Sequence, residues 1–110
     1  MMALMEIFEE RERERKRHQE DALREVYRLA ALLKERFDFE SLYVVGSLLK
    51  DRFRKGSDID LVIKGLKKED FFRAHAFLMD KSRYRIDLKP FEDLHEDFKK
   101  LVLKGGLKIE

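Results

Sequence analysis

The chain has 110 residues, enough for one small domain and too few for a second domain with its own core. Charged residues make up 44% of it, yet 25 basic and 23 acidic side chains leave a net charge of only +2, so composition favours neither a nucleic-acid surface nor a membrane. It has no cysteine, which excludes disulfides and cysteine metal sites, and its start lacks the pattern of a signal peptide, so we expect a cytoplasmic protein.

The first third of the chain is predicted to form one long helix. Apolar residues in Met1–Phe8 are followed by thirteen residues, Glu9–Asp21, without an apolar side chain, where opposite charges four residues apart support a solvated helix. Within Ala22–Phe37 apolar residues recur at the spacing of a helix that packs on one face. One helix from Glu6 to Phe37 would be roughly 48 Å long, so its first half cannot lie on the core.

This helix divides the chain into a charged helical arm, residues 1–21, and a domain, residues 22–110. Two interpretations of the arm stay open. It is either a frayed polar segment, or an arm whose apolar tip docks on a second copy of the chain or on another partner.

The rest of the chain alternates between strands and helices. This alternation predicts an α/β (α+β) fold in which helices pack on a small mixed sheet of three or more strands. The short connections between strands favour a mixed sheet over a fully parallel one. The predicted elements are a strand at 42–45, a short helix at 47–53, a strand at 58–63, a helix at 67–81, a strand at 84–89, a last helix opened by Pro90, and a tail at 107–110 that can pair as a short strand.

Aromatic residues are expected mainly inside the protein. The nine phenylalanines fall mostly at helical core positions, a pattern that does not favour a surface for stacking bases. In the last helix, Phe98 and Leu101 have the spacing of buried residues.

Gly46 and Ser47 end the first strand. A glycine turn that leads into a helix presents backbone N–H groups that can hold a phosphate. Taken alone, the pair equally fits a plain strand-to-helix turn with a serine cap. Lys50 and Arg52 follow and are candidates for contact with a triphosphate, the alternative being an ordinary solvated loop.

Three aspartates form the most informative pattern. Side chains on a strand alternate between faces, so Asp58 and Asp60 point the same way, roughly 7 Å apart at their Cα atoms. Asp87 repeats the apolar-acid-apolar pattern on the third strand and joins the pair if the two strands are neighbours. Three carboxylates could hold two Mg²⁺ ions, and Asp87 would help to deprotonate an acceptor hydroxyl. An edge strand with a polar outer face is the alternative.

These motifs together resemble a known family. Gly46-Ser47, ten intervening residues, Asp58-Ile59-Asp60-Leu61 and the later Asp87 resemble the nucleotidyltransferase superfamily that includes DNA polymerase beta, most closely its minimal nucleotidyltransferases. The resemblance implies a polymerase beta-like fold in which Gly46 and Ser47 bind the triphosphate, Asp58 and Asp60 ligate Mg²⁺ and Asp87 is the third carboxylate. The segment 48–55 departs from many relatives, which carry a small residue and an Arg-Gly pair there, and this leaves the nucleotide contacts open.

The resemblance also implies a function. Family members of this size commonly pair with a helical HEPN toxin, and the nucleotidyltransferase acts as the antitoxin by transferring AMP from ATP to a tyrosine hydroxyl of that toxin. One alternative is a non-catalytic subunit that acts by complex formation through its long helix, which is also a possible homodimer surface. Another is a small-molecule nucleotidyltransferase, which needs an acceptor pocket that the sequence does not reveal.

Overall fold

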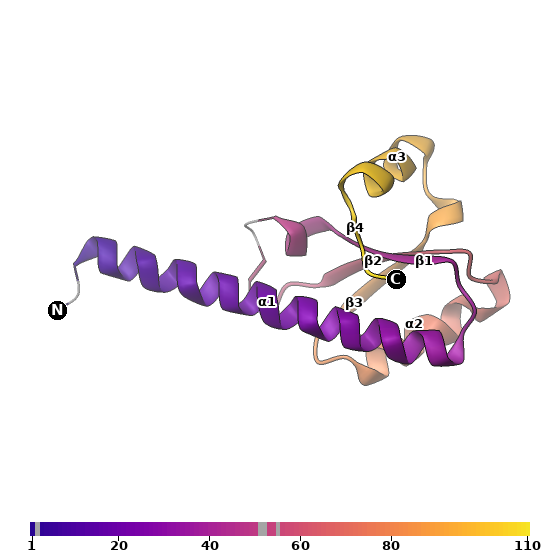
Figure 1. The fold of residues 1–110 in the computed structure, drawn as a ribbon, viewed down its shortest axis with the longest axis horizontal. Coiled ribbons are helices and arrows are strands. Elements are labelled where there is room, and N and C mark those ends of the chain that lie inside the picture. The colour runs from indigo at the N-terminus through magenta and orange to yellow at the C-terminus, as the bar shows by residue number, and fades with distance from the viewer. Residues whose placement is uncertain (2, 51–52, 55) are drawn as a thin grey trace.

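A four-stranded mixed sheet carries helices on both of its faces (Figure 1). The computed structural model describes residues 1, 3–50, 53–54 and 56–110. Within these residues the helices are α1 (Leu4–Arg36), α2 (Phe71–Lys81) and α3 (Glu96–Gly105), the strands are β1 (Ser41–Val45), β2 (Ile59–Lys64), β3 (Ile86–Pro90) and β4 (Leu107–Lys108), and the 3₁₀ helices are η1 (Gly46–Leu49), η2 (Lys68–Asp70) and η3 (Phe91–Asp93).

The strand order brings distant segments together. Across the sheet the order is β3-β2-β1-β4, with β1 antiparallel to both β2 and β4, and with β2 parallel to β3. A parallel pair needs a crossover connection, which α2 provides. The expected mixed sheet and α/β class are therefore confirmed. The tail forms a short strand as expected, since β4 pairs with β1.

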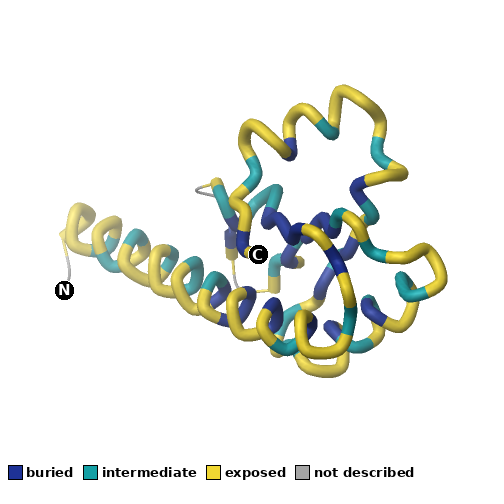
Figure 2. The backbone as a smooth tube through the Cα atoms, turned by 45° about the vertical axis from the view of Figure 1, so that its right-hand side comes forward, coloured by how far each residue is buried: buried dark blue, intermediate teal, exposed yellow. Residues whose placement is uncertain are grey.

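The second half of α1 packs on one face of the sheet. Its buried residues recur at helical spacing from Ala22 to Leu33 and share one cluster with Ala74 and Leu78 of α2. Figure 2 shows these buried stretches facing one another across the interior. Each fully buried leucine contributes roughly 1.5–3 kcal/mol, so this cluster dominates stability. The strands contribute Leu42, Val44, Ile59, Leu61, Ile63, Ile86 and Leu88.

The first half of α1 projects beyond the sheet (Figure 1). Leu4, Met5 and Phe8 are 82%, 67% and 58% exposed, and the first buried residue of the helix is Ala22. The expectation that this half cannot lie on the core is confirmed, while the division of the chain at residue 21 stays a prediction. Across the described residues, no helix is both long enough and apolar enough to cross a membrane.

The opposite face of the sheet carries a smaller apolar cluster beneath α3. Tyr43 of β1, Val62 of β2, Phe91 of η3 and Val102 of α3 form it. Because this cluster is small, it covers only part of the face. The remaining part is left to polar side chains.

The last helix begins later than predicted. Pro90 does not open it, because Pro90 is the last residue of β3 and α3 starts at Glu96. A proline has no N–H to donate, and it is tolerated in β3 because this strand lies at the edge of the sheet. The N-cap of α3 is His95, whose Nδ1 accepts a hydrogen bond from the backbone N–H of Asp97.

Two further predictions are wrong. Phe98 and Leu101 are 39% and 65% exposed, because Val102 alone anchors α3 in the small cluster. The short helix predicted at 47–53 is the 3₁₀ helix η1, which ends where the N–H of Lys50 bonds back to the carbonyl of Ser47. Other boundaries shift by one or two residues, except that the first turn of the helix predicted at 67–81 is the separate 3₁₀ helix η2.

A buried glutamate ties α1 to the segment before β3. Glu25 accepts hydrogen bonds from Nε and Nη2 of Arg28, at 2.7 and 3.0 Å, and from the backbone N–H of Arg83 at 2.8 Å. Nη2 of Arg28 also donates to the carbonyl of Lys81 at 2.7 Å. The hydrogen bonds from Arg28, followed by that from Arg83, lower the pKa of Glu25 against the opposing effect of burial.

Replacing Glu25 with Gln is expected to lower the free energy of unfolding by roughly 1–3 kcal/mol at neutral pH. Because folding lowers the pKa of this carboxyl, its contribution is present above the ordinary glutamate pKa of about 4.3 and is lost as the pH falls through the lower folded value. Urea unfolding at neutral and acidic pH measures both effects. Glu20→Gln, at an exposed position on the same helix, is the control. Equal stabilities of the Glu25 and Glu20 variants at neutral pH would contradict the assignment.

Candidate functional site

The turn after β1 presses the backbone against an aspartate. Gly46 has φ of +77°, in the left-handed region that residues with a Cβ disfavour. A Cβ on Gly46 would lie 2.5 Å from Oδ2 of Asp60. Position 46 therefore requires glycine for two reasons, the left-handed turn and the close approach to the carboxylate of Asp60. Ser47 follows within η1 and is half-buried.

The three aspartates lie on one side of the sheet. In β2, Asp60 is the register partner of Val45 in β1 and of Asp87 in β3. The residues on either side of Asp60 are buried in the main cluster on the opposite face. Asp58 comes just before β2, two residues from Asp60. The structure therefore brings Asp87 beside Asp60, whereas a metal site formed by all three aspartates stays a prediction.

Two basic side chains accompany the outer aspartates. Nε of Arg85 donates to Oδ1 of Asp58 at 3.0 Å, and Nζ of Lys89 donates to Oδ2 of Asp87 at 2.5 Å. All four side chains are substantially exposed. Exposed ion pairs contribute about 0–1 kcal/mol, so another cation can take the place of these partners at little cost.

Asp60 lies deeper than the other two aspartates. Partial burial raises the pKa of Asp60, and the charge of Asp87 raises it further, while Lys89 opposes the increase. The ionised form of Asp60 therefore carries unfavourable energy that a cation placed between the carboxylates would relieve. The electrostatics of this position favour cation binding.

The donor set suits a hard divalent metal. Mg²⁺ prefers oxygen ligands and usually takes one or two protein carboxylates, with phosphate oxygens and water completing its shell. Asp60 and Asp87 are neighbours in register and offer such a pair. In the part of the chain that the structure describes, no three acidic or histidine side chains are arranged as a complete metal site. The residues thus fit a metal that arrives with phosphate ligands better than one held by protein alone.

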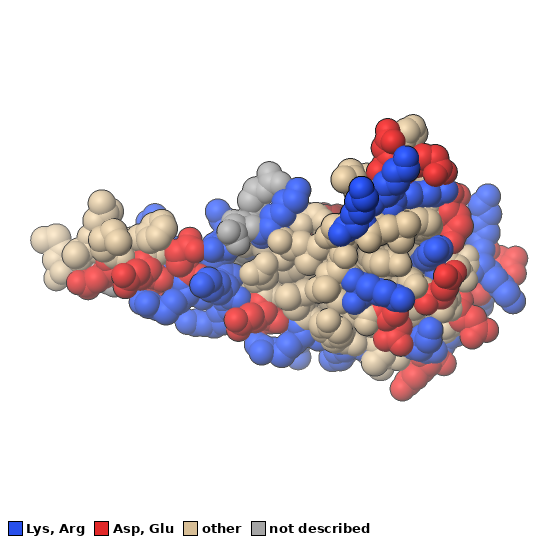
Figure 3. Space-filling view, turned by 45° about the horizontal axis from the view of Figure 1, so that its top comes forward, with Lys and Arg blue, Asp and Glu red and all other residues tan. Residues whose placement is uncertain are grey.

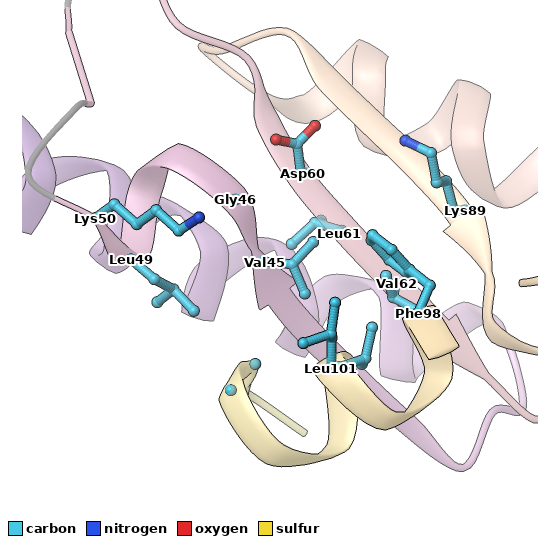
Figure 4. A pocket seen from close by; sticks show the side chains of 13 residues that line it. Val45, Gly46, Leu49, Lys50, Asp60, Leu61, Val62, Lys89, Phe98 and Leu101 are labelled. Atoms are coloured by element: carbon cyan, nitrogen blue, oxygen red, sulfur yellow. The ribbon is translucent and has the colours of Figure 1, made fainter. Parts of the chain in front are cut away.

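A cleft of about 480 Å³ opens beside Asp60, between the sheet and α3. In Figure 4, Asp60 and Lys89 project from the sheet and Lys50 reaches in from the end of the glycine turn. On the other side, Phe98 and Leu101 rise from α3 toward the sheet. The end of the cleft at Lys50 and Asp60 is therefore charged, and the side formed by α3 is an apolar wall.

The predicted site residues are largely brought together. Gly46, Lys50 and Asp60 line the cleft, and Ser47 adjoins Gly46 in the turn. Asp87 lies beside Asp60, and Asp58 lies two residues before it. The predicted contact of Arg52 with a nucleotide lies outside the described residues.

Sequence reasoning missed four residues near this site. Lys89 could have been found, because strand alternation places it on the same side as Asp87. Arg85 precedes β3, and its pairing with Asp58 depends on strand order, which the sequence does not reveal. Phe98 and Leu101 were assigned to the core because helical spacing identifies a face but not what lies opposite.

Comparisons with known proteins agree with this architecture. Residues 26–109 match the sequence profile of a family described as "Nucleotidyltransferase domain". Among solved structures, the chain is similar to "Crystal structure of the toxin-antitoxin with AMP-PNP", with a TM-score of 0.64 and 16% sequence identity over 76% of this chain and 72% of that chain. At this identity the likeness shows the fold. The sequence has no match among curated proteins.

Replacing Gly46 with Ala is expected to destabilise the protein more than replacing Gly56 with Ala. Both glycines have left-handed φ, +77° and +89°, so each substitution loses about 1–2 kcal/mol from backbone strain. Only Gly46 adds a collision with Asp60, since a Cβ on Gly56 meets nothing within 4 Å. Urea unfolding of both variants measures the difference.

A double variant isolates the contact. Adding Asp60→Ala to Gly46→Ala removes the carboxylate that the new Cβ would meet, so part of the lost stability should return. Equal losses for Gly46→Ala and Gly56→Ala would show that the turn does not press on Asp60.

Proposed function

The chain belongs to the nucleotidyltransferase domain family, and on that premise we propose that it transfers AMP from ATP to a hydroxyl group of a partner protein. The observation that supports this most is the register of β2 with β3, which sets Asp60 beside Asp87 at the charged end of a cleft. A glycine turn adjoins the same carboxylate. The structural neighbour was crystallised with AMP-PNP, an adenine nucleotide, which supports ATP as the donor.

The proposed reaction is a single displacement at phosphorus. The acceptor oxygen forms a bond to the α-phosphorus of ATP, the bond from that phosphorus to the oxygen bridging to the β-phosphate breaks, and pyrophosphate leaves. The hydroxyl proton passes to a carboxylate, for which Asp87 is the candidate. Most of the rate then comes from positioning and from charge stabilisation, because such transfers need little covalent chemistry from the protein.

The chain's own residues divide this work by position. Gly46 and Ser47 offer backbone N–H groups to the triphosphate, and Lys50 adds a positive charge at the same end of the cleft. Asp60 and Asp87, with Asp58 as the third predicted ligand, are the residues that would hold Mg²⁺ together with the phosphates, and the ion when bound neutralises charge on those phosphates. Arg85 and Lys89 pair with the outer carboxylates, Asp58 and Asp87, until then.

Asp60→Asn is expected to reduce AMP transfer by about 100-fold or more, because it removes a charge at the reacting end of the cleft. The assay follows label from [α-³²P]ATP into a purified helical toxin of the HEPN type, with Mg²⁺ present. Asp80→Asn is the matched control, since Asp80 is exposed on α2, which covers the opposite face of the sheet.

Parallel reactions with [γ-³²P]ATP should leave the acceptor unlabelled. Label from the γ position would indicate a kinase instead. Transfer by Asp60→Asn at the rate of Asp80→Asn would refute the assigned site.

The exposed half of α1 supports a second candidate function, binding without catalysis. Leu4, Met5 and Phe8 leave apolar side chains in water, and Figure 3 shows this uncharged tip followed by acidic and basic side chains along the arm. Clustered exposed apolar groups are typical of a contact surface. The structural neighbour is a toxin-antitoxin complex, which supports an antitoxin role with a toxin as partner.

Two partners are compatible with this second candidate function. A helical toxin of the HEPN type is the occupant that the family resemblance favours, and a second copy of this chain is the other. An antitoxin that acts by complex formation alone would need the arm and would not need the three aspartates.

Removing residues 1–17 is expected to abolish co-elution of the toxin while leaving the domain folded. The truncated chain keeps all buried residues of α1 and keeps Gln19, whose Nε2 donates to the carbonyl of Leu48 at 2.7 Å. Size-exclusion chromatography measures co-elution, and thermal unfolding checks the fold. Co-elution that survives the truncation would rule out the arm as the partner surface.

Neutralisation of the toxin separates the two candidates. If a full-length variant with Asn at positions 58, 60 and 87 still neutralises the toxin, binding is the function. If that variant fails while still co-eluting, transfer is the function.

A further inference from the structure

Helix α3 leaves two large apolar side chains exposed on the side that faces the sheet. Phe98 and Leu101 have the spacing of core residues, yet 39% and 65% of their surfaces are exposed. Both line the cleft and point from α3 toward the sheet (Figure 4). The helix is anchored instead by the buried Val102. Val102 thus anchors α3, and Phe98 and Leu101 line the cleft without being buried in the core.

At Gly105, the end of α3 leaves room beside this wall. Gly105 and Gly106 line the cleft without side chains of their own, and a Cβ on Gly105 would meet nothing within 4 Å. Val45 at the end of β1 and Leu49 of η1 complete the apolar surface. The volume of about 480 Å³ lies within the range of about 300–1,000 Å³ found for small-ligand clefts.

The distribution of charge within the cleft defines the shape of its occupant. Among the described residues that line it, the charged side chains are Lys50, Asp60 and Lys89. In Figure 4, Lys50 and Asp60 lie away from the wall formed by Phe98 and Leu101, while Lys89 lies on the same side as Phe98. A molecule that fits both ends has an anionic group at one end and a flat apolar face at the other. A nucleotide has this form.

We propose that the base of the bound nucleotide lies against Phe98 and Leu101, with its triphosphate at Gly46 and Lys50. This inference rests on the proposed function, because it takes the charged end to be the phosphate site. The described wall side chains carry no hydrogen-bonding groups, so they contact the face of the base and not its edge. Stacking of this kind tolerates different bases, and the wall therefore contributes affinity without selecting adenine over guanine.

The test compares two probes, ATP and inorganic tripolyphosphate, by titration calorimetry in magnesium buffer. Phe98→Ala is expected to weaken ATP binding about 10- to 100-fold, as loss of one stacking contact does, and to leave tripolyphosphate binding within about twofold of wild type. Leu103→Ala is the matched control, because Leu103 is 54% exposed on α3 and does not line the cleft. It should change neither affinity.

A second variant covers the case in which Phe98→Ala fails to fold. Phe98→Leu keeps apolar bulk and loses the aromatic face, and it should weaken ATP binding in the same selective way. Phe98→Trp restores a ring and should bind ATP within a fewfold of wild type.

Several results would overturn the assignment. ATP binding by Phe98→Ala and Phe98→Leu at wild-type affinity would exclude the base and would leave an acceptor group as the occupant of the wall. Equal weakening of both probes would show that Phe98 acts only through the structure. Wild-type protein that binds tripolyphosphate as tightly as ATP would overturn the base site alone, whereas binding of neither probe would overturn the proposed function as well.

Discussion

The arrangement of the site depends on the register between β2 and β3. This register sets two carboxylates, Asp60 and Asp87, directly beside each other. Like charges side by side are unfavourable, so their positions must be fixed by other forces. The buried side chains of both strands provide them, because a slip of one residue would turn Ile86 and Leu88 out of the core. Burial of apolar side chains on one face of the sheet thus keeps the two carboxylates adjacent on the other face, in spite of their repulsion.

Basic residues in β3 and directly before it offset that repulsion. Lys89 and Arg85 pair with the outer aspartates, while the glycine turn closes over Asp60 without adding a counter-charge. The pairs are exposed and weak, so they prevent accumulation of negative charge without filling the site permanently. The result is an acidic cluster whose like charges are offset by weak, exposed partners.

How much of this could be predicted depends on which features are local. Strand alternation is local, and it correctly placed Asp60 and Asp87 on faces opposite to their buried neighbours. The spacing of apolar residues along the second half of α1 is local too, and it correctly predicted a helix that packs on one face. Strand order is not local, so the pairing of Arg85 with Asp58 could not be foreseen. Helical spacing identifies a face of α3, but the small cluster under that helix admits Val102 and leaves Phe98 exposed, and no pattern in the sequence marks that difference.

The position of the arm relative to the turn links the two surfaces of the molecule. Helix α1 is continuous from Leu4 to Arg36, so its buried second half holds the exposed first half in place. Where the arm leaves the domain, Gln19 donates a hydrogen bond to the carbonyl of Leu48, a residue of η1 and a neighbour of the glycine turn. The base of the arm and the carboxylate of Asp60 are therefore linked through one short segment, because η1 accepts the hydrogen bond from Gln19 and begins with the glycine that lies against Asp60.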